Sequence, residues 1–162
     1  MKWWPVILCF LVSACDFTVP LSLAPQLSLD QRVVGLWEGK MAGGNTERLL
    51  VLPLNDREYL LSWPKGANTE LYARAHLFEY SGLTLVQLQW FGNSDGIVPD
   101  SDDVYQVATY TITDNRLVIE MLNPEVVGSV HKSTADLAAA IEKNRNNAAL
   151  FHNKMVYDQI LE

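Results

Sequence analysis

Alternation of apolar and polar residues along most of the chain is the feature that most limits its fold. From Arg32 onward, seven segments alternate in this way, and turn residues such as Gly, Pro, Asn and Asp separate them. Because successive side chains of a β-strand point to opposite faces of a sheet, this period of two predicts strands. The predicted strands cover residues 32–40, 46–54, 58–63, 69–80, 83–91, 104–113 and 116–122.

The order of these segments predicts how the strands pair. Consecutive strands joined by short turns run antiparallel, and such a meander must close or stack to hide its apolar face. In the second segment, Leu50, Leu52 and Leu54 share one face. We therefore predict a mainly β fold (a β-rich α+β fold), in which an antiparallel meander of about seven strands forms a small barrel or sandwich.

The pattern changes near Asn123, where helical signals begin. Asn123 precedes a proline, and Ser133 precedes Asp136 by three residues, an arrangement resembling a capping box. These signals predict a helical C-terminal part from about residue 123, covering an open end or an edge of the sheet. Residues 146–162 either extend the helix or return as a strand.

The N-terminal segment predicts export from the cytoplasm. Lys2 is followed by an apolar run from Trp3 to Leu11, which is too short to span a bilayer of about 30 Å as a helix. The next four residues, Val12-Ser13-Ala14-Cys15, resemble the bacterial lipobox. The resemblance implies that a diacylglyceryl group is added to the Cys15 thiol and that the chain is then cut before this residue. An ordinary signal peptide or a plain anchor helix is the alternative.

This resemblance also implies a domain plan and a location. Residues 1–14 are expected to be a signal peptide, residues 15–31 a lipidated cysteine with its tether, and residues 32–162 a single β-rich domain. The protein is expected to be a lipoprotein of the bacterial cell envelope. If the cell is Gram-negative, it faces the periplasm, and Asp16 favours the inner membrane.

Composition limits the partners. The chain carries a net charge of −7 and has no cluster of Lys and Arg. An acidic domain repels nucleic acid and anionic headgroups, so we expect no nucleic-acid partner. The expected partners are the membrane, through the N-terminal lipid, and either envelope proteins or a small lipophilic ligand.

A second, shorter resemblance concerns the first predicted strand. Gly35-Leu36-Trp37 is similar to the Gly-x-Trp that opens the first strand of lipocalins and related calycin barrels. The resemblance implies that Trp37 packs across the bottom of a barrel against an arginine from a late strand, and Arg116 stands near that place. It also implies a carrier of a small ligand.

The fourth predicted strand offers a candidate binding face. Tyr72, Arg74, His76 and Phe78 alternate along it, so they share one side. Arginine and histidine between aromatic residues can line a barrel mouth and hold an anionic or amphipathic ligand. The same alternation also describes a solvent face or a surface on which the C-terminal helices pack, and we favour the structural interpretation.

The sequence predicts no catalytic residue, metal site or cofactor. Four aspartates, Asp95, Asp100, Asp102 and Asp103, gather in one loop, but their spacing differs from that of a calcium-binding EF-hand loop. The three histidines, His76, His131 and His152, lack the spacing of zinc ligands. Motifs for a nucleophilic serine or a phosphate-binding loop do not occur, which makes an enzyme the less favoured class.

Two classes of function therefore stay open. The first, which we favour from the sequence, is a lipid-anchored, non-catalytic accessory or interaction module of the cell envelope. The second is a calycin-like carrier of a small apolar or amphipathic ligand. The interior distinguishes them, because a carrier needs an enclosed volume of about 300 Å³ or more.

Overall fold

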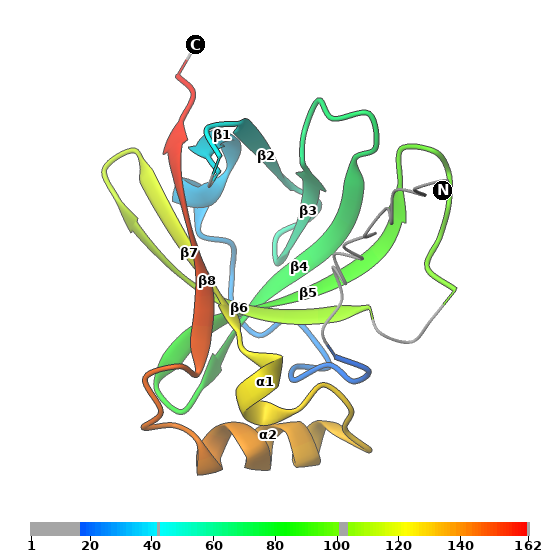
Figure 1. Ribbon diagram of the computed structural model, residues 1–162, viewed down its shortest axis with the longest axis vertical. Coiled ribbons are helices and arrows are strands. Elements are labelled where there is room, and N and C mark those ends of the chain that lie inside the picture. Colours follow the sequence, from blue (N-terminus) through cyan, green and yellow to red (C-terminus); the bar gives the residue numbers. More distant parts are fainter. Residues whose placement is uncertain (1–16, 42, 101–103, 162) are drawn as a thin grey trace, which may run out of the picture.

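The computed structural model describes residues 17–41, 43–100 and 104–161. In this part of the chain, eight antiparallel strands form a closed barrel in which each strand pairs with its neighbours in sequence (Figure 1). The chain is thus mainly β, as predicted, and the meander closes as a barrel. The strands are β1 Gly35–Lys40, β2 Thr46–Pro53, β3 Glu58–Trp63, β4 Leu71–Tyr80, β5 Leu83–Asn93, β6 Tyr105–Thr113, β7 Arg116–Leu122 and β8 Phe151–Gln159.

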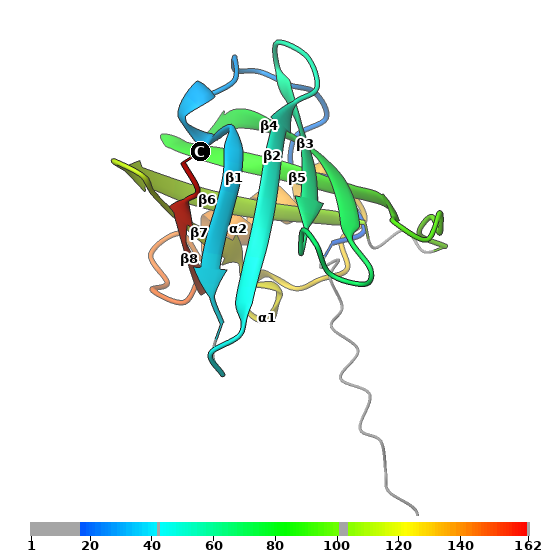
Figure 2. The same ribbon diagram turned by 90° about the horizontal axis from the view of Figure 1, so that it is seen from above.

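The strands cross at a steep angle on opposite sides of the barrel. Figure 2 shows β1 and β2 passing in front of β5 and β6, which run across them. The longest strands, β4 and β5, pair from Leu71 with Asn93 to Tyr80 with Leu83 and connect the two sides. Inward-facing side chains from both sides therefore share one enclosed interior.

The eighth strand closes the barrel. β8 pairs with β7 along its length and with β1 from Trp37 opposite Gln159 to Gly39 opposite Tyr157. A Cβ atom at Gly39 would lie 2.9 Å from Cδ1 of Tyr157 and 2.8 Å from the carbonyl oxygen of Val156. Only glycine leaves room for the Tyr157 ring at this closure.

Two helices lie between the last two strands, α1 Pro124–Val127 and α2 Thr134–Lys143. The predicted caps are present, because the Asn123 side chain accepts from the Glu125 N–H and the Ser133 side chain accepts from the Asp136 N–H. The predicted C-terminal helices are therefore present, and the tail, for which the sequence left a helix or a strand open, returns as β8, which makes eight strands in place of about seven. Figure 1 shows both helices on one side of the barrel, below β6 and β8.

The helices create a second apolar cluster outside the barrel. Leu137 and Ile141 of α2 pack with Phe78, Leu85 and other outward-facing strand residues. Because Leu137 and Ile141 are four residues apart, they lie on the same face of the helix. The molecule therefore has an inner cluster within the barrel and an outer cluster between the strands and the helices.

The segment predicted as a tether packs against the barrel over its described length. Phe17 is fully buried, and its backbone N–H and carbonyl bond to the backbone of Tyr105 at 3.0 and 3.2 Å. Leu21 is 7% exposed, and the backbone N–H groups of Leu21 and Ser22 donate to the buried Gln87 side chain at 2.7 and 3.2 Å. The described residues of this segment therefore belong to the folded domain, which extends on the N-terminal side of Arg32 at least to Phe17. The reason is apolar burial, because this segment covers outward-facing strand residues.

Candidate functional site

The interior of the barrel contains a cavity of about 260 Å³. Within the described residues, the strands β2 to β8 contribute side chains to its wall, and Val33 contributes from a short 3₁₀ helix, η1 Gln31–Val33. Most of the wall is aliphatic or aromatic, so the cavity offers a ligand mainly apolar surface. Its aliphatic part includes Leu49, Val51, Leu77, Leu88, Leu117 and Ile119.

Small side chains leave this interior unfilled. Ala75 and Ala108 lie on the inner face and line the cavity. Larger inward-facing residues, including Leu61, Val86 and Met155, line it as well but are only partly buried. A closely packed barrel would bury these side chains fully. Their partial exposure therefore indicates accessible space inside the barrel.

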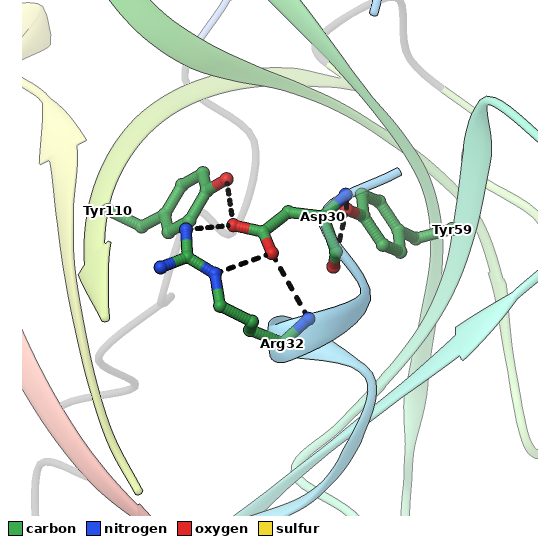
Figure 3. A network of polar contacts seen from close by, with 4 residues as sticks. All are labelled: Asp30, Arg32, Tyr59 and Tyr110. Atoms are coloured by element: carbon green, nitrogen blue, oxygen red, sulfur yellow. Dashed lines mark hydrogen bonds and ion pairs between the residues drawn. The ribbon is translucent and has the colours of Figure 1, made fainter. Parts of the chain in front are cut away.

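A network of polar contacts around Asp30 lies beside one part of the cavity wall, where Tyr59 and Tyr110 line it (Figure 3). The Asp30 carboxylate accepts hydrogen bonds from the Arg32 guanidinium at 2.9 and 2.7 Å and from the Tyr110 hydroxyl at 3.1 Å. The Tyr59 hydroxyl accepts from the Asp30 N–H at 2.6 Å and donates to the Asp30 carbonyl at 3.2 Å. Since Tyr59 belongs to β3 and Tyr110 to β6, the network fastens η1 to two separate strands.

The ionisable groups that bond to one another in this network each keep one ionisation state near neutral pH. Hydrogen bonds from Arg32 lower the pKa of Asp30 below its ordinary value. Burial raises the pKa of Tyr59 to about 12 and also raises the pKa of Tyr110 above its ordinary value. A charged carboxylate thus lies between two neutral phenols, which suits a structural closure of the barrel.

A second carboxylate, Glu47, lies toward the other end of the barrel. It pairs with Gly39 near the start of β2, whereas the far end of β2 pairs with Tyr59. Glu47 Oε1 accepts from Trp63 Nε1 at 2.5 Å and from the Tyr157 hydroxyl at 3.0 Å. Burial, followed by the Glu47 charge, raises the pKa of Tyr157, so its phenol stays protonated. Two neutral donors therefore hold Oε1 of Glu47.

Aromatic rings surround the same end of the cavity. Trp63, Trp90 and Tyr157 all line it, and the centroids of the two indole rings are 6.4 Å apart. Trp90 Nε1 donates to Gln106 Oε1 at 2.8 Å, as Trp63 Nε1 does to Glu47. With both indole N–H groups bonded, the tryptophans offer the cavity ring surface.

The predicted binding face lies outside the barrel. Tyr72, Arg74, His76 and Phe78 point away from the interior, because the alternate residues of β4 form the cavity wall. Phe78 is 2% exposed and belongs to the outer cluster with the helices. The Tyr72 ring stacks on Phe91 with centroids 6.4 Å apart. The two aromatic residues thus act in packing on the outer surface.

The two basic residues of that face have local partners. Arg74 forms an ion pair with Glu58 at 2.7 Å. His76 Nε2 lies 3.0 Å from the Ser22 hydroxyl, and burial lowers the pKa of His76. The face therefore holds the N-terminal segment and a neighbouring strand, and it does not reach the cavity.

The carboxylate and histidine candidates stay apart. Asp95 accepts a hydrogen bond from Thr69 at 3.1 Å, and His131 Nε2 lies 2.9 Å from the Gly128 carbonyl oxygen. His152 lies on β8. Among the residues that the structure describes, no three His, Cys, Asp or Glu side chains are placed to hold a metal ion. Asp102 and Asp103 lie outside the described residues.

The structure places Trp37 and Arg116 but does not describe the lipobox residues. Val12-Ser13-Ala14-Cys15 and Asp16 lie outside the described residues. Trp37 is fully buried, and its Nε1 donates to the Val33 carbonyl at 2.9 Å. The expected packing of Arg116 on Trp37 is replaced by an ion pair with Asp158 at 2.9 Å, in which the Arg116 side chain is 62% exposed.

Sequence reasoning missed the inward-facing carboxylate. Glu47 is in phase with Leu49 and Val51, both of which line the cavity. A charged residue at the start of a strand usually indicates a solvent-facing position, which hid its role. The available signal was the alternation itself, because Glu47 lies on the same face of β2 as Leu49 and Val51, which both point inward.

The fold and its interior define a closed up-and-down β-barrel with an apolar internal cavity. Comparison of the chain with protein-family models, with curated proteins and with solved structures returned no match. Within the described residues, helices with the length and apolar character needed to cross a bilayer are absent.

Proposed function

We propose that this protein is a non-catalytic binding protein that carries one small, mainly apolar molecule inside its barrel. The observation that supports the proposal is the apolar cavity of about 260 Å³ within a closed barrel. Cavities cost folding stability in proportion to their volume, because atoms on their walls lose contacts. A ligand that fills this space restores those contacts.

The cavity volume limits the size of the ligand. Drug-sized molecules occupy pockets of roughly 300–1,000 Å³, and benzene binds in an engineered cavity of roughly 150 Å³. The volume of about 260 Å³ lies between these values and slightly below the volume of about 300 Å³ expected from the sequence for a carrier, so a carrier with this cavity takes a ligand smaller than a drug-sized molecule. We therefore favour a ligand with one ring or a short chain over a long fatty acid or a haem-sized molecule.

The alternative, an accessory module without a ligand, predicts a different composition of the purified protein. Native mass spectrometry of protein purified from its own membranes distinguishes the two functions. The carrier predicts a stoichiometric adduct of small mass that is lost on denaturation. A polypeptide that co-purifies in place of any small adduct would support the accessory module and contradict the carrier.

We further propose that the protein is held at a membrane of the bacterial cell envelope by lipid on Cys15. The support is the sequence Val12-Ser13-Ala14-Cys15 after a short apolar run. Each buried CH₂ of an acyl chain contributes about 0.8 kcal/mol, so two or three chains give stable anchoring. Asp16 favours the inner membrane in a Gram-negative cell.

A single substitution tests the anchor. Cys15→Ser removes the thiol that would accept the lipid, so we expect the variant to lose palmitate labelling and the mature membrane-bound form. Membrane fractionation and labelling with radioactive palmitate measure both effects. If the variant is processed and fractionates like the parent, the lipid anchor is excluded, while the carrier function is unaffected.

A further inference from the structure

A carboxylate lies beside each end of the cavity and bonds to residues that line it, Asp30 to Tyr59 and Tyr110, and Glu47 to Trp63 and Tyr157. The two carboxylates differ in their partners. Asp30 is neutralised by an ion pair with Arg32 at 2.7 Å. Glu47 accepts hydrogen bonds only from neutral donors, and it has no ion pair among the residues that the structure describes. The interior is therefore electrically asymmetric, with uncompensated negative charge at the Glu47 end.

Glu47 is not itself a lining residue of the cavity, but it lies directly beside Trp63 and Tyr157, which line it. Its side chain is half-buried on the inner face of β2, the face that also presents Leu49 and Val51 to the cavity. Trp63 and Tyr157 both donate to Oε1. In the described part of the chain, no hydrogen bond occupies Oε2. One oxygen thus holds the side chain in place, and the other retains its capacity to accept.

The aromatic residues beside Glu47 suit the same kind of ligand. Trp63, Trp90 and Tyr157 line the cavity at this end. The face of an aromatic ring attracts a cation through its quadrupole, and the attraction is stronger where water is excluded. A carboxylate next to three rings favours an ammonium group over a neutral or anionic group.

We propose that the cavity takes a small apolar amine whose ammonium group lies at Glu47 and whose apolar body extends toward Val33. This inference rests on the proposed carrier function and specifies its ligand class. An anionic ligand would meet the charge of Glu47 in a site with little water, which is strongly unfavourable. The overall net charge of −7 also attracts cations toward the protein.

Three probes of matched size test the charge preference. Isothermal titration calorimetry of the full chain at pH 7 compares 2-phenylethylamine, 2-phenylethanol and phenylacetate, which are a cation, a neutral molecule and an anion. A charge-assisted hydrogen bond in a partly buried site predicts that the amine binds about 10- to 100-fold more tightly than the alcohol. Phenylacetate is expected to bind most weakly.

A substitution assigns the preference to Glu47. Glu47→Gln keeps an oxygen that accepts from Trp63 and Tyr157 but removes the charge, so the amine is expected to lose its advantage and bind within about threefold of the alcohol. Glu38→Gln is the matched control. Glu38 lies on β1, where it pairs with Arg48 at 2.9 Å and is 39% exposed. This control is expected to keep the preference of the parent.

Each outcome separates the ligand class from the carrier function. If the alcohol binds the parent as tightly as the amine, or if Glu47→Gln keeps the preference, the assignment of an amine is overturned and the carrier function stands. If none of the probes binds and native mass spectrometry finds no adduct, the carrier function fails as well. Should Glu47→Gln not fold, as judged by circular dichroism, the ranking of the probes on the parent decides.

Discussion

The hydroxyl of Tyr59 holds Asp30 by its backbone, accepting from the N–H at 2.6 Å and donating to the carbonyl at 3.2 Å. The ring of Tyr59 is 3% exposed and lines the cavity. A single side chain thus connects the cavity wall to the segment that leads into η1. This contact, together with the one from Tyr110, therefore ties that segment to the barrel wall.

Replacement of Tyr59 by phenylalanine is expected to lower stability without changing the fold. Tyr59→Phe removes both hydrogen bonds to Asp30, and the free energy of unfolding should fall by about 1–2 kcal/mol. Urea unfolding followed by tryptophan fluorescence measures the change.

Tyr72→Phe is the matched control, because Tyr72 packs on Phe91 on the outer face of β4 and its hydroxyl has no hydrogen bond among the described residues. Its effect should stay within about 0.5 kcal/mol. Equal effects of the two substitutions would contradict a specific role for the Tyr59 hydroxyl.

Acid is expected to destabilise the protein partly through Glu70, which lies between β3 and β4. Hydrogen bonds from the Ser62 hydroxyl, the Gly66 N–H and Lys65 lower the pKa of Glu70 to about 2 in the folded protein. The unfolded chain binds its proton near the ordinary value of 4.5. The contribution of Glu70 is therefore complete above about pH 4.5 and is lost as the pH falls toward 2.

Chemical unfolding at several pH values tests this linkage. Between pH 4.5 and 2, the free energy of unfolding of Glu70→Gln should fall less steeply than that of the parent, because the variant cannot take up the proton. Glu38→Gln controls for the change in net charge. Parallel curves for Glu70→Gln and the parent would show that the carboxylate does not contribute as described.

Alternation grouped the residues of each strand by face, but it did not show which face points into the barrel. In β4, the alternate residues Ala75 and Leu77 line the cavity as period two requires. In β2, the face that carries Leu50 and Leu52 is the outer one, with Leu52 40% exposed, and Leu54, just after the strand, is 48% exposed. Both faces of this strand carry aliphatic residues, so alternation alone could not orient it.

The sequence did not decide whether residues 146–162 extend a helix or form a strand, and the structure gives a physical reason. The pairing of β7 with β8 shifts register between Ile119 and Met121, and Asn153 has a φ of 52° in the same stretch. A bulge interrupts strict alternation, and the exposed strand residues around it are polar. Likewise, the docking of Phe17 depends on contacts with residues far along the chain, which no local pattern reveals.

Loss of Gln87 is expected to release the N-terminal segment before the barrel opens. Gln87 is 2% exposed, and its carbonyl oxygen accepts from the N–H groups of Leu21 and Ser22. Gln87→Met keeps the length of the side chain but removes both acceptor contacts. Amide hydrogen exchange over residues 21–29 should accelerate about tenfold or more, with a smaller change in the strands.

Gln89→Met provides the comparison for that experiment. Gln89 lies two residues further along β5 and is exposed. Its substitution should leave exchange in the N-terminal segment unchanged. If Gln87→Met accelerates exchange equally throughout the barrel, the N-terminal segment and the barrel unfold as one cooperative unit. Gln87 would then not hold this segment locally.

Filling the cavity is expected to abolish binding while preserving stability. Ala108 is 2% exposed and lines the cavity. In Ala108→Leu the added carbons enter existing space, so burial should leave the free energy of unfolding unchanged or raise it by up to about 2 kcal/mol. In a closely packed core, the same change would lower it by about 1–3 kcal/mol.

The sign of that stability change therefore tests whether the interior is hollow, and calorimetry with 2-phenylethanol tests whether it binds. We expect at least a tenfold loss of affinity in Ala108→Leu, because the side chain occupies part of the volume of about 260 Å³. Ala139→Leu, at an exposed position of α2, controls for added apolar surface. The opposite outcome would be an Ala108→Leu variant that is destabilised and still binds the alcohol like the parent. The leucine side chain and the ligand would then not compete for the same space, so the binding site would lie elsewhere.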